Sequence, residues 1–202
     1  MVHWKTDDEK SEIQTGESNM SKTISDDIDR VLIAEDEIEK RCQELAHEIE
    51  ADYAAEGTMP IVVGLLKGSV PFMAELIKYF TQPIEIDFMS VSSYAGTESI
   101  GDVKIDKDMD LSSRSKHVLI VEDIVDTGRT LKEVKKLFFN KGASDVKVVA
   151  LLDKPERRIV DIQADYVGFT VPNEFVVGYG LDYNQKYRNL PYIGVLKHEI
   201  YD

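Results

Sequence analysis

Three acidic side chains stand close together near the middle of the chain. Glu122 and Asp123 directly follow the apolar run Val118–Val121, and Asp126 comes four residues after Glu122. Carboxylates accept hydrogen bonds and bind hard cations, so they suit the hydroxyl groups of a sugar and a metal ion such as magnesium. This group of acids therefore predicts contacts with a sugar or a metal ion rather than with a bare phosphate.

The next four residues, Thr127-Gly128-Arg129-Thr130, suit a phosphate group instead. They stand where a helix is expected to begin, and free backbone N–H groups at a helix N-terminus bind anions. Gly128 permits close approach of a ligand, and the two threonine hydroxyl groups can hydrogen-bond to phosphate oxygens. The alternative is an ordinary turn in which Asp126 or Thr127 caps the helix, but the preceding acids favour a binding loop. Acids and loop together predict a site for a phosphorylated sugar with magnesium.

Strands and helices in alternation must position these residues. Two continuous apolar runs, Ile61–Leu66 and Val118–Val121, are typical of strands buried on both faces of a sheet, and Val146–Leu152 predicts the next strand. Apolar residues at steps of three and four predict helices over Ile38–Tyr53 and about Thr130–Asn140. A strand, a helix and a strand in this order form a parallel, right-handed crossover. We therefore expect an α/β domain whose mostly parallel central sheet is flanked by helices, with ligands bound at the carboxyl ends of its strands.

Three further segments differ from this pattern. Residues 1–27 contain few apolar side chains, and we interpret them as a flexible N-terminal extension of a domain that spans residues 28–202. The stretch Tyr94–Asp110 is polar and long for a connection, which is typical of a functional lid. Residues Ala164–Lys197 indicate shorter strands and loops, and we expect them to form a small hood.

The charge balance limits the possible partners. The 202 residues include 24 Lys and Arg against 38 Asp and Glu, a net charge of 24 − 38 = −14. Nucleic acids and anionic membranes need a basic surface, so neither is expected as a partner. Cys42 is the only cysteine, which excludes an intrachain disulfide and a zinc site built on cysteines. Since the sequence has no secretory signal and no apolar run of roughly 20 residues, we expect a cytoplasmic protein.

Residues 118–130 resemble the phosphoribosyl-diphosphate motif of the type I phosphoribosyltransferase family. Further blocks follow in the family's order between Val31 and Val195: Leu66-Lys67-Gly68-Ser69, Val91-Ser92-Ser93-Tyr94, Leu151-Leu152-Asp153-Lys154 and Phe175 to Asn184. Within the family, the chain is most similar to the hypoxanthine-guanine phosphoribosyltransferases. The resemblance implies the fold of that family, a homodimer or homotetramer, and purine salvage with Mg²⁺. In that reaction the 5-phosphoribosyl group moves from 5-phosphoribosyl-1-diphosphate to hypoxanthine or guanine, giving IMP or GMP and diphosphate.

The resemblance also implies a role for each matching residue. Asp126 is expected to be the catalytic acid or base. Diphosphate binding, often with a cis peptide bond at this point in the family, is expected at Lys67, Gly68 and Arg188. Ribose 5-phosphate binding is expected at Glu122, Asp123, Thr127, Gly128, Arg129 and Thr130. The purine is expected at Lys154, Phe175 and Val176, Mg²⁺ at Glu122, Asp123 and Asp182, and a mobile loop at Ser93 and Tyr94.

The choice of base depends on Lys154. Its ammonium group has three hydrogen-bond donors and no acceptor, so it fits the 6-oxo group of a purine and mismatches the 6-amino group of adenine. Xanthine also has a 6-oxo group, so a xanthine-preferring enzyme stays an alternative. A second alternative is a non-enzymatic regulator on the same fold that senses phosphoribosyl-diphosphate and binds nucleic acid. The acidic balance of the chain counts against that regulator. No role follows from the sequence for the neighbouring Asp153.

Overall fold

A six-stranded sheet forms the centre of the protein. The computed structural model describes residues 23–93 and 103–202. The strands run in the spatial order β4-β3-β2-β5-β6-β7, and all neighbouring pairs are parallel except β3 with β4. Their bounds are β2 Ile61–Leu65, β3 Glu85–Ser93, β4 Val103–Lys107, β5 His117–Val125, β6 Asp145–Asp153 and β7 Tyr166–Thr170. The expected α/β fold with a mostly parallel sheet is confirmed.

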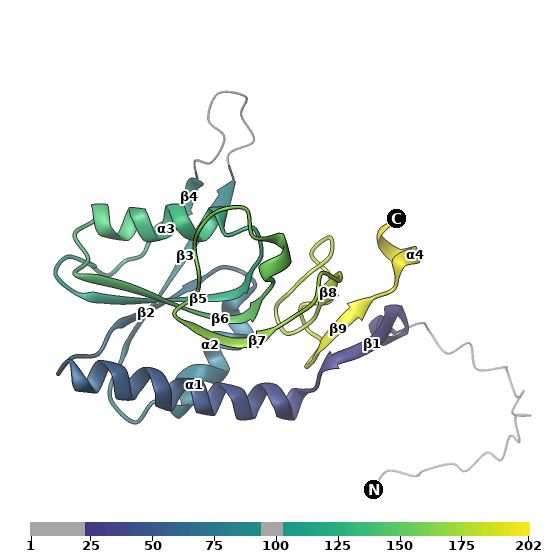
Figure 1. Ribbon diagram of the computed structural model, residues 1–202, viewed down its shortest axis with the longest axis horizontal. Coiled ribbons are helices and arrows are strands. Elements are labelled where there is room, and N and C mark those ends of the chain that lie inside the picture. The colour runs from purple at the N-terminus through teal and green to yellow at the C-terminus, as the bar shows by residue number, and fades with distance from the viewer. Residues whose placement is uncertain (1–22, 94–102) are drawn as a thin grey trace, which may run out of the picture.

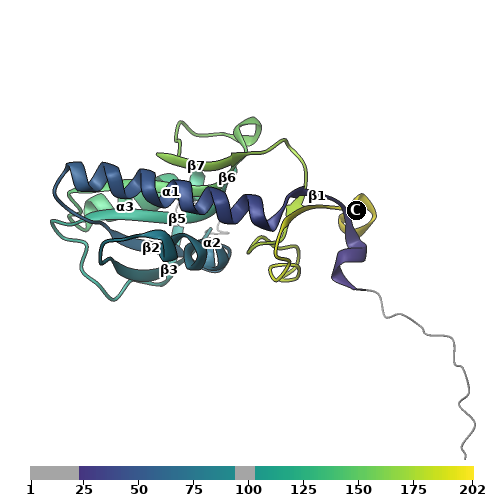
Figure 2. The same ribbon diagram turned by 90° about the horizontal axis from the view of Figure 1, so that it is seen from below.

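Helices cover both faces of this sheet. Figures 1 and 2 show α1 (Glu35–Ala55) on one face and α3 (Arg129–Asn140) on the other, with α2 (Ser69–Leu76) on the same side as α1. The buried side chains of α1 recur at steps of three and four, so the helix turns one continuous apolar stripe toward the sheet: Ile38, Cys42, Leu45, Ala46, Ile49 and Tyr53. Short 3-10 helices are Ile24–Asp27, Ile77–Tyr79 and Pro155–Arg157, and α4 spans His198–Tyr201. No helix within residues 23–93 and 103–202 is long and apolar enough to cross a membrane.

Successive residues of the central strands face opposite sides of the sheet, so the sheet separates two hydrophobic cores. Leu119 and Val121 pack with α1 and α2, whereas Val118 and Ile120 pack with α3. Ile61–Leu65, Val118–Val121 and Val148–Leu152 are fully buried between the two cores, which explains their apolar sequences. The acids at the end of β5 therefore directly follow a buried part of the strand.

A second, three-stranded sheet forms the hood. It consists of β1 (Ile28–Ile33), β9 (Ile193–Leu196) and β8 (Val176–Val177) in that order, paired antiparallel. The hood lies beyond one end of the central sheet (Figure 1). The sequence assigns Ala164–Lys197 to the hood, and one part of that interpretation is wrong, because Tyr166–Thr170 is an edge strand of the central sheet. The hood also contains β1, from the start of the domain, which the sequence analysis did not predict.

Regular structure begins a few residues before the expected domain boundary at residue 28. The 3-10 helix Ile24–Asp27 lies against the hood, where the Asp27 carbonyl oxygen accepts a hydrogen bond from the Lys197 backbone N–H at 3.0 Å. The Asp27 carboxylate also accepts one from the Tyr187 hydroxyl at 2.8 Å. Residues 1–22, which contain most of the expected extension, lie outside the described residues. The domain boundary at residue 28 and the flexibility of the extension stay predictions.

Candidate functional site

Three acids, Glu122, Asp123 and Asp126, lie at the carboxyl end of β5. They lie beside the loop Asp126–Thr130, called the phosphate loop below because it is expected to bind phosphate. The strand continues through Glu122 and Asp123 and ends at Val125, so these two acids belong to the strand and do not follow it as the sequence suggests. The N-cap of α3 is Gly128, so neither Asp126 nor Thr127 occupies the cap position, although the Thr127 hydroxyl accepts a 3.5 Å hydrogen bond from the Arg129 N–H. The alternative interpretation, in which Asp126 caps the helix, is therefore wrong. The Asp126 side chain is left for another role.

Gly128 has a backbone conformation that other residues rarely adopt. Its φ of 80° lies in the left-handed region, and a Cβ atom at this position would lie 2.5 Å from Cγ2 of Ile162. A small cavity of about 90 Å³ adjoins this turn and is lined by residues 124–128 together with Glu122, Thr130 and Leu131. The turn thus leads directly into the N-terminus of α3, the arrangement that binds phosphate groups.

The two acids of β5 differ in their surroundings. Burial raises the pKa of the Glu122 carboxyl well above its ordinary value, and the charge of Asp123 raises it further. Burial also raises the pKa of Asp123, but a hydrogen bond from the Ile124 N–H at 2.8 Å and the charge of Arg188 offset part of that increase. Both carboxyl groups are therefore weaker acids than free carboxyl groups, and Asp123 has a hydrogen-bond donor and a nearby cation that favour its charged form.

The loop after β2 lies against Asp123. A Cβ atom on Gly68 would be 1.5 Å from Oδ2 of Asp123, so no other residue fits at this position without a shift of the carboxylate. The peptide bond between Leu66 and Lys67 is cis. The expected diphosphate-binding residues Lys67 and Gly68 therefore lie beside the expected ribose-binding acid.

A second basic group comes from the hood side of the site. An Nη2 atom of Arg188 lies 2.7 Å from Oδ1 of Asp182, and Nη1 donates to the Gly180 carbonyl oxygen at 2.6 Å. The side-chain oxygen of Gln185 lies 3.4 Å from both Arg188 Nη2 and Lys67 Nζ. The expected diphosphate contacts Lys67 and Arg188 are thus brought together through Gln185, a residue that the sequence argument missed.

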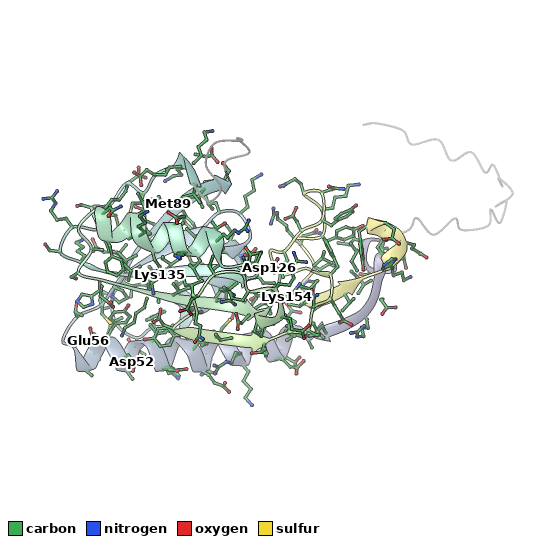
Figure 3. All side chains as sticks on the ribbon, turned by 45° about the horizontal axis from the view of Figure 1, so that its top comes forward. Asp52, Glu56, Met89, Asp126, Lys135 and Lys154 are labelled. Carbon is green, nitrogen blue, oxygen red and sulfur yellow. The ribbon has the colours of Figure 1, made fainter. Side chains whose placement is uncertain are left out.

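Lys154 lies at the end of β6, on the side of the expected base. Its side chain is only 7% exposed, and Nζ donates to the Glu174 carbonyl oxygen at 2.8 Å. Burial lowers the pKa of Lys154, while the charge of Asp126 acts in the opposite direction. Figure 3 shows Asp126 and Lys154 close together, between the central sheet and the hood. The ammonium group is therefore fixed in place near the candidate catalytic acid.

Aromatic rings gather around Phe175, the residue after Glu174, whose carbonyl oxygen holds Lys154. The Phe175 ring is 37% exposed, stacks on Tyr201 with a centroid distance of 4.8 Å, and meets the edge of Tyr183 at 5.5 Å. Val176, by contrast, is buried in β8. Phe175 is thus a partly open aromatic ring of the kind on which a purine can stack, with Tyr201 stacked on it.

Two predicted groups of residues are not brought into a described site. Tyr94 lies outside the described residues, and Ser93 is the last residue of β3. Within residues 23–93 and 103–202, no three Asp, Glu, His or Cys side chains are grouped so that they could hold a metal ion. The role of Glu122, Asp123 and Asp182 as magnesium ligands therefore stays a prediction.

The sequence argument also missed two arginines that follow Lys154. Nε of Arg157 lies 2.9 Å from Oδ1 of Asp126, and Nε of Arg158 donates to the Asp126 carbonyl oxygen at 3.0 Å. A basic pair four and five residues beyond the end of strand β6 was the available signal. It places positive charge beside the candidate catalytic acid.

Comparisons with known proteins agree with this geometry. Residues 12–184 match the family model described as a phosphoribosyl transferase domain. The chain is 55% identical over 179 residues to a hypoxanthine-guanine phosphoribosyltransferase of Streptococcus pneumoniae, covering 88% of this chain and 98% of the relative. It is 54% identical over 184 residues to that of Lactococcus lactis, covering 91% and 99%. The crystal structure of a Staphylococcus aureus hypoxanthine phosphoribosyltransferase superposes with a TM-score of 0.85 at 49% identity, covering 91% of this chain and 99% of that one. The chain therefore belongs to the phosphoribosyltransferase family, among the hypoxanthine-guanine phosphoribosyltransferases.

Proposed function

We propose that this enzyme transfers the 5-phosphoribosyl group from 5-phosphoribosyl-1-diphosphate to hypoxanthine or guanine, giving IMP or GMP and diphosphate. One observation carries the choice of base. Strands β5 and β6 pair in register through Val125 and Asp153, so the next residues, Asp126 and Lys154, leave the sheet side by side. A donor-only side chain beside an acid, at the edge that also carries the phosphate loop, suits a 6-oxopurine held against a phosphorylated sugar.

The reaction breaks the bond between the sugar C1 and the diphosphate and forms a bond from C1 to a purine ring nitrogen. Lys67 and Arg188 place positive charge where the diphosphate leaves. The phosphate loop and Asp123 hold the ribose 5-phosphate, and Phe175 and Lys154 orient the base. The Asp126 carboxylate takes the proton that the ring nitrogen loses. Holding both substrates in line contributes at least as much as this proton transfer.

Magnesium fits the acids of this site. Mg²⁺ keeps several waters and usually binds through one or two carboxylates plus substrate phosphates, so a cage of three protein ligands is not needed. The Asp182 carboxylate is held in place by the Gln185 N–H at 2.8 Å and by Arg188, at the point where the diphosphate is expected. When bound with the diphosphate, the ion would neutralise the charge of the leaving group.

Removing divalent metal is expected to stop turnover. A metal ion that stabilises the leaving group supplies several kcal/mol, so activity should fall by at least about 100-fold in excess chelator. The measurement is diphosphate release after dialysis against EDTA, followed by addition of Mg²⁺ or Mn²⁺. The control is a melting curve in EDTA, which should match that of the untreated protein. Full turnover in excess chelator contradicts a role for the metal.

The base itself is tested with a panel. Diphosphate release from 5-phosphoribosyl-1-diphosphate is measured with hypoxanthine, guanine, xanthine and a pyrimidine. Hypoxanthine and guanine are expected to turn over at about 1–10³ per second, the usual range for enzymes. Xanthine as the preferred base would favour the one alternative that the 6-oxo argument leaves open. No release with any 6-oxopurine would overturn the proposed function.

We expect the acidic chain to act on small-molecule substrates as a homodimer or homotetramer in the cytoplasm, with neither a nucleic-acid nor a membrane partner. The net charge of −14 supports the absence of nucleic acid. It also counts against the regulator on the same fold.

A further inference from the structure

The backbone of the phosphate loop is held by one neighbouring segment. The Val125 carbonyl oxygen accepts from the Lys154 N–H at 3.0 Å, and the Thr127 carbonyl oxygen accepts from the Ile159 and Val160 N–H groups at 3.1 and 3.4 Å. Arg158 provides the contacts between them. The segment 154–160, which begins at the lysine proposed to contact the base, thus binds the backbone of the loop.

The guanidinium of Arg158 is the centre of this support. Its side chain is 15% exposed, Nε donates to the Asp126 carbonyl oxygen at 3.0 Å, and Nη2 donates to the Val125 carbonyl oxygen at 3.2 Å. The remaining contacts are to the Ile162 carbonyl oxygen through Nη1 and to Oδ1 of Asp153 through Nη2. Four of its five N–H groups are therefore in use, a pattern that only the planar fork of arginine can satisfy.

These contacts set the direction of the loop's peptide groups. In a trans peptide the C=O of one residue and the N–H of the next point in opposite directions. The carbonyl groups of Val125, Asp126 and Thr127 face the segment 154–160, so the N–H groups of Asp126, Thr127 and Gly128 point away from it. The stem of Arg158 also lies under the turn, since a Cβ atom on Gly128 would be 3.0 Å from its Cδ.

We propose that Arg158, paired with Asp153, is a positioning residue that orients the phosphate loop toward the ribose 5-phosphate group. This inference rests on the proposed function. It also gives a role to Asp153, whose carboxylate balances the half-buried guanidinium and holds it under the loop. Arg158 acts through the backbone of Val125 and Asp126 and does not itself touch the substrate.

The test replaces Arg158 by lysine and Asp153 by asparagine. Lysine keeps the charge but concentrates its donors at one point, so it cannot reach the three carbonyl groups together. Affinity for ribose 5-phosphate, measured by calorimetry, should fall about 10–100-fold in Arg158→Lys, the usual cost of losing a supporting contact. The loss in Asp153→Asn should be smaller, because the fork stays in place. The KM for hypoxanthine should change much less than the affinity for ribose 5-phosphate in both variants.

Arg41 provides a matched control. It also donates to two backbone carbonyl groups, those of Val167 at 2.8 Å and Gly168 at 3.2 Å, and it pairs with Glu44. These contacts hold the edge strand β7 and no loop of the site. Arg41→Lys should lower the melting temperature about as much as Arg158→Lys but leave ribose 5-phosphate binding unchanged.

The outcomes separate the inference from the proposed function. Equal ribose 5-phosphate affinity in wild type, Arg158→Lys and Arg41→Lys would overturn the inference, since Arg158 would then only stabilise the fold. If Arg158→Lys does not fold, unchanged affinity in Asp153→Asn has the same consequence. A wild-type chain that binds ribose 5-phosphate but transfers the phosphoribosyl group of 5-phosphoribosyl-1-diphosphate to no base would overturn the proposed function alone.

Discussion

Asp126→Asn is expected to lower turnover with hypoxanthine by about 10²–10⁴-fold, the range that general acid–base catalysis contributes. Asparagine keeps the size of the side chain but cannot accept the proton that the purine ring nitrogen loses. The neighbouring Arg157, 2.9 Å from the Asp126 carboxylate, would keep a polar partner in the variant. The expected loss therefore reflects chemistry rather than a rearranged loop.

Substrate binding should survive this change. The loop around Asp126 is held through its backbone, because the Asp126 carbonyl oxygen accepts from Arg158 and the helix is capped at Gly128 without a side chain. The KM for 5-phosphoribosyl-1-diphosphate should therefore change far less than the turnover number. A fall in kcat with a nearly constant KM is the signature of an interaction made only in the transition state.

Asp145→Asn provides the matched control for this prediction. The Asp145 side chain is 37% exposed, against 38% for Asp126. Asp145 is the first residue of β6, so it lies at the edge of the sheet opposite to the site. The control variant should turn over hypoxanthine at the wild-type rate. Steady-state kinetics and melting curves on both variants decide the matter. Wild-type turnover in a folded Asp126→Asn variant would remove Asp126 from the mechanism.

The parts of this site that the sequence predicts are those that depend on local order. Glu122, Asp123 and the loop Asp126–Thr130 are consecutive, and the apolar runs around them specify parallel strands that end at the same edge. Since every parallel strand delivers its last residues to that edge, Lys154 could be placed near Asp126 without coordinates. The same argument places Lys67 at the end of β2.

Contacts between distant segments could not be predicted in this way. Nothing local shows that Gly68 touches Asp123, or that Arg158 supports the carbonyl groups of a loop 32 residues earlier. Strand β1 was missed because its apolar run, Val31–Ile33, is only three residues long and follows the charged Asp29 and Arg30. Strand β4 was missed because it is exposed and polar along almost its whole length. Whether an edge segment forms a strand depends more on pairing with its neighbouring strand than on the pattern of its own side chains.

Adenine is expected to be turned over about 10⁴-fold less efficiently than hypoxanthine, because a site built to hydrogen-bond one group rejects an analogue that lacks it by that order. The Lys154 ammonium group is fixed by the Glu174 carbonyl oxygen at 2.8 Å and is almost fully buried, so it cannot turn away from the base. A 6-oxo group accepts its remaining donors. A 6-amino group would place donor against donor without water to separate them.

Lys154→Gln tests directly whether Lys154 selects the base. A glutamine amide offers an acceptor as well as a donor, so the variant can present either to position 6 of the purine. The ratio of kcat/KM for hypoxanthine over adenine should shrink from about 10⁴ to about 10², mainly through the loss of hypoxanthine turnover. Lys147→Gln is the control, because Lys147 lies in β6, the strand that Lys154 follows, and is partly buried beside Glu56, at the far end from the site. That variant should keep the wild-type ratio. An adenine kcat/KM close to that of hypoxanthine in the wild type, or an unchanged ratio in Lys154→Gln, would show that another group selects the base.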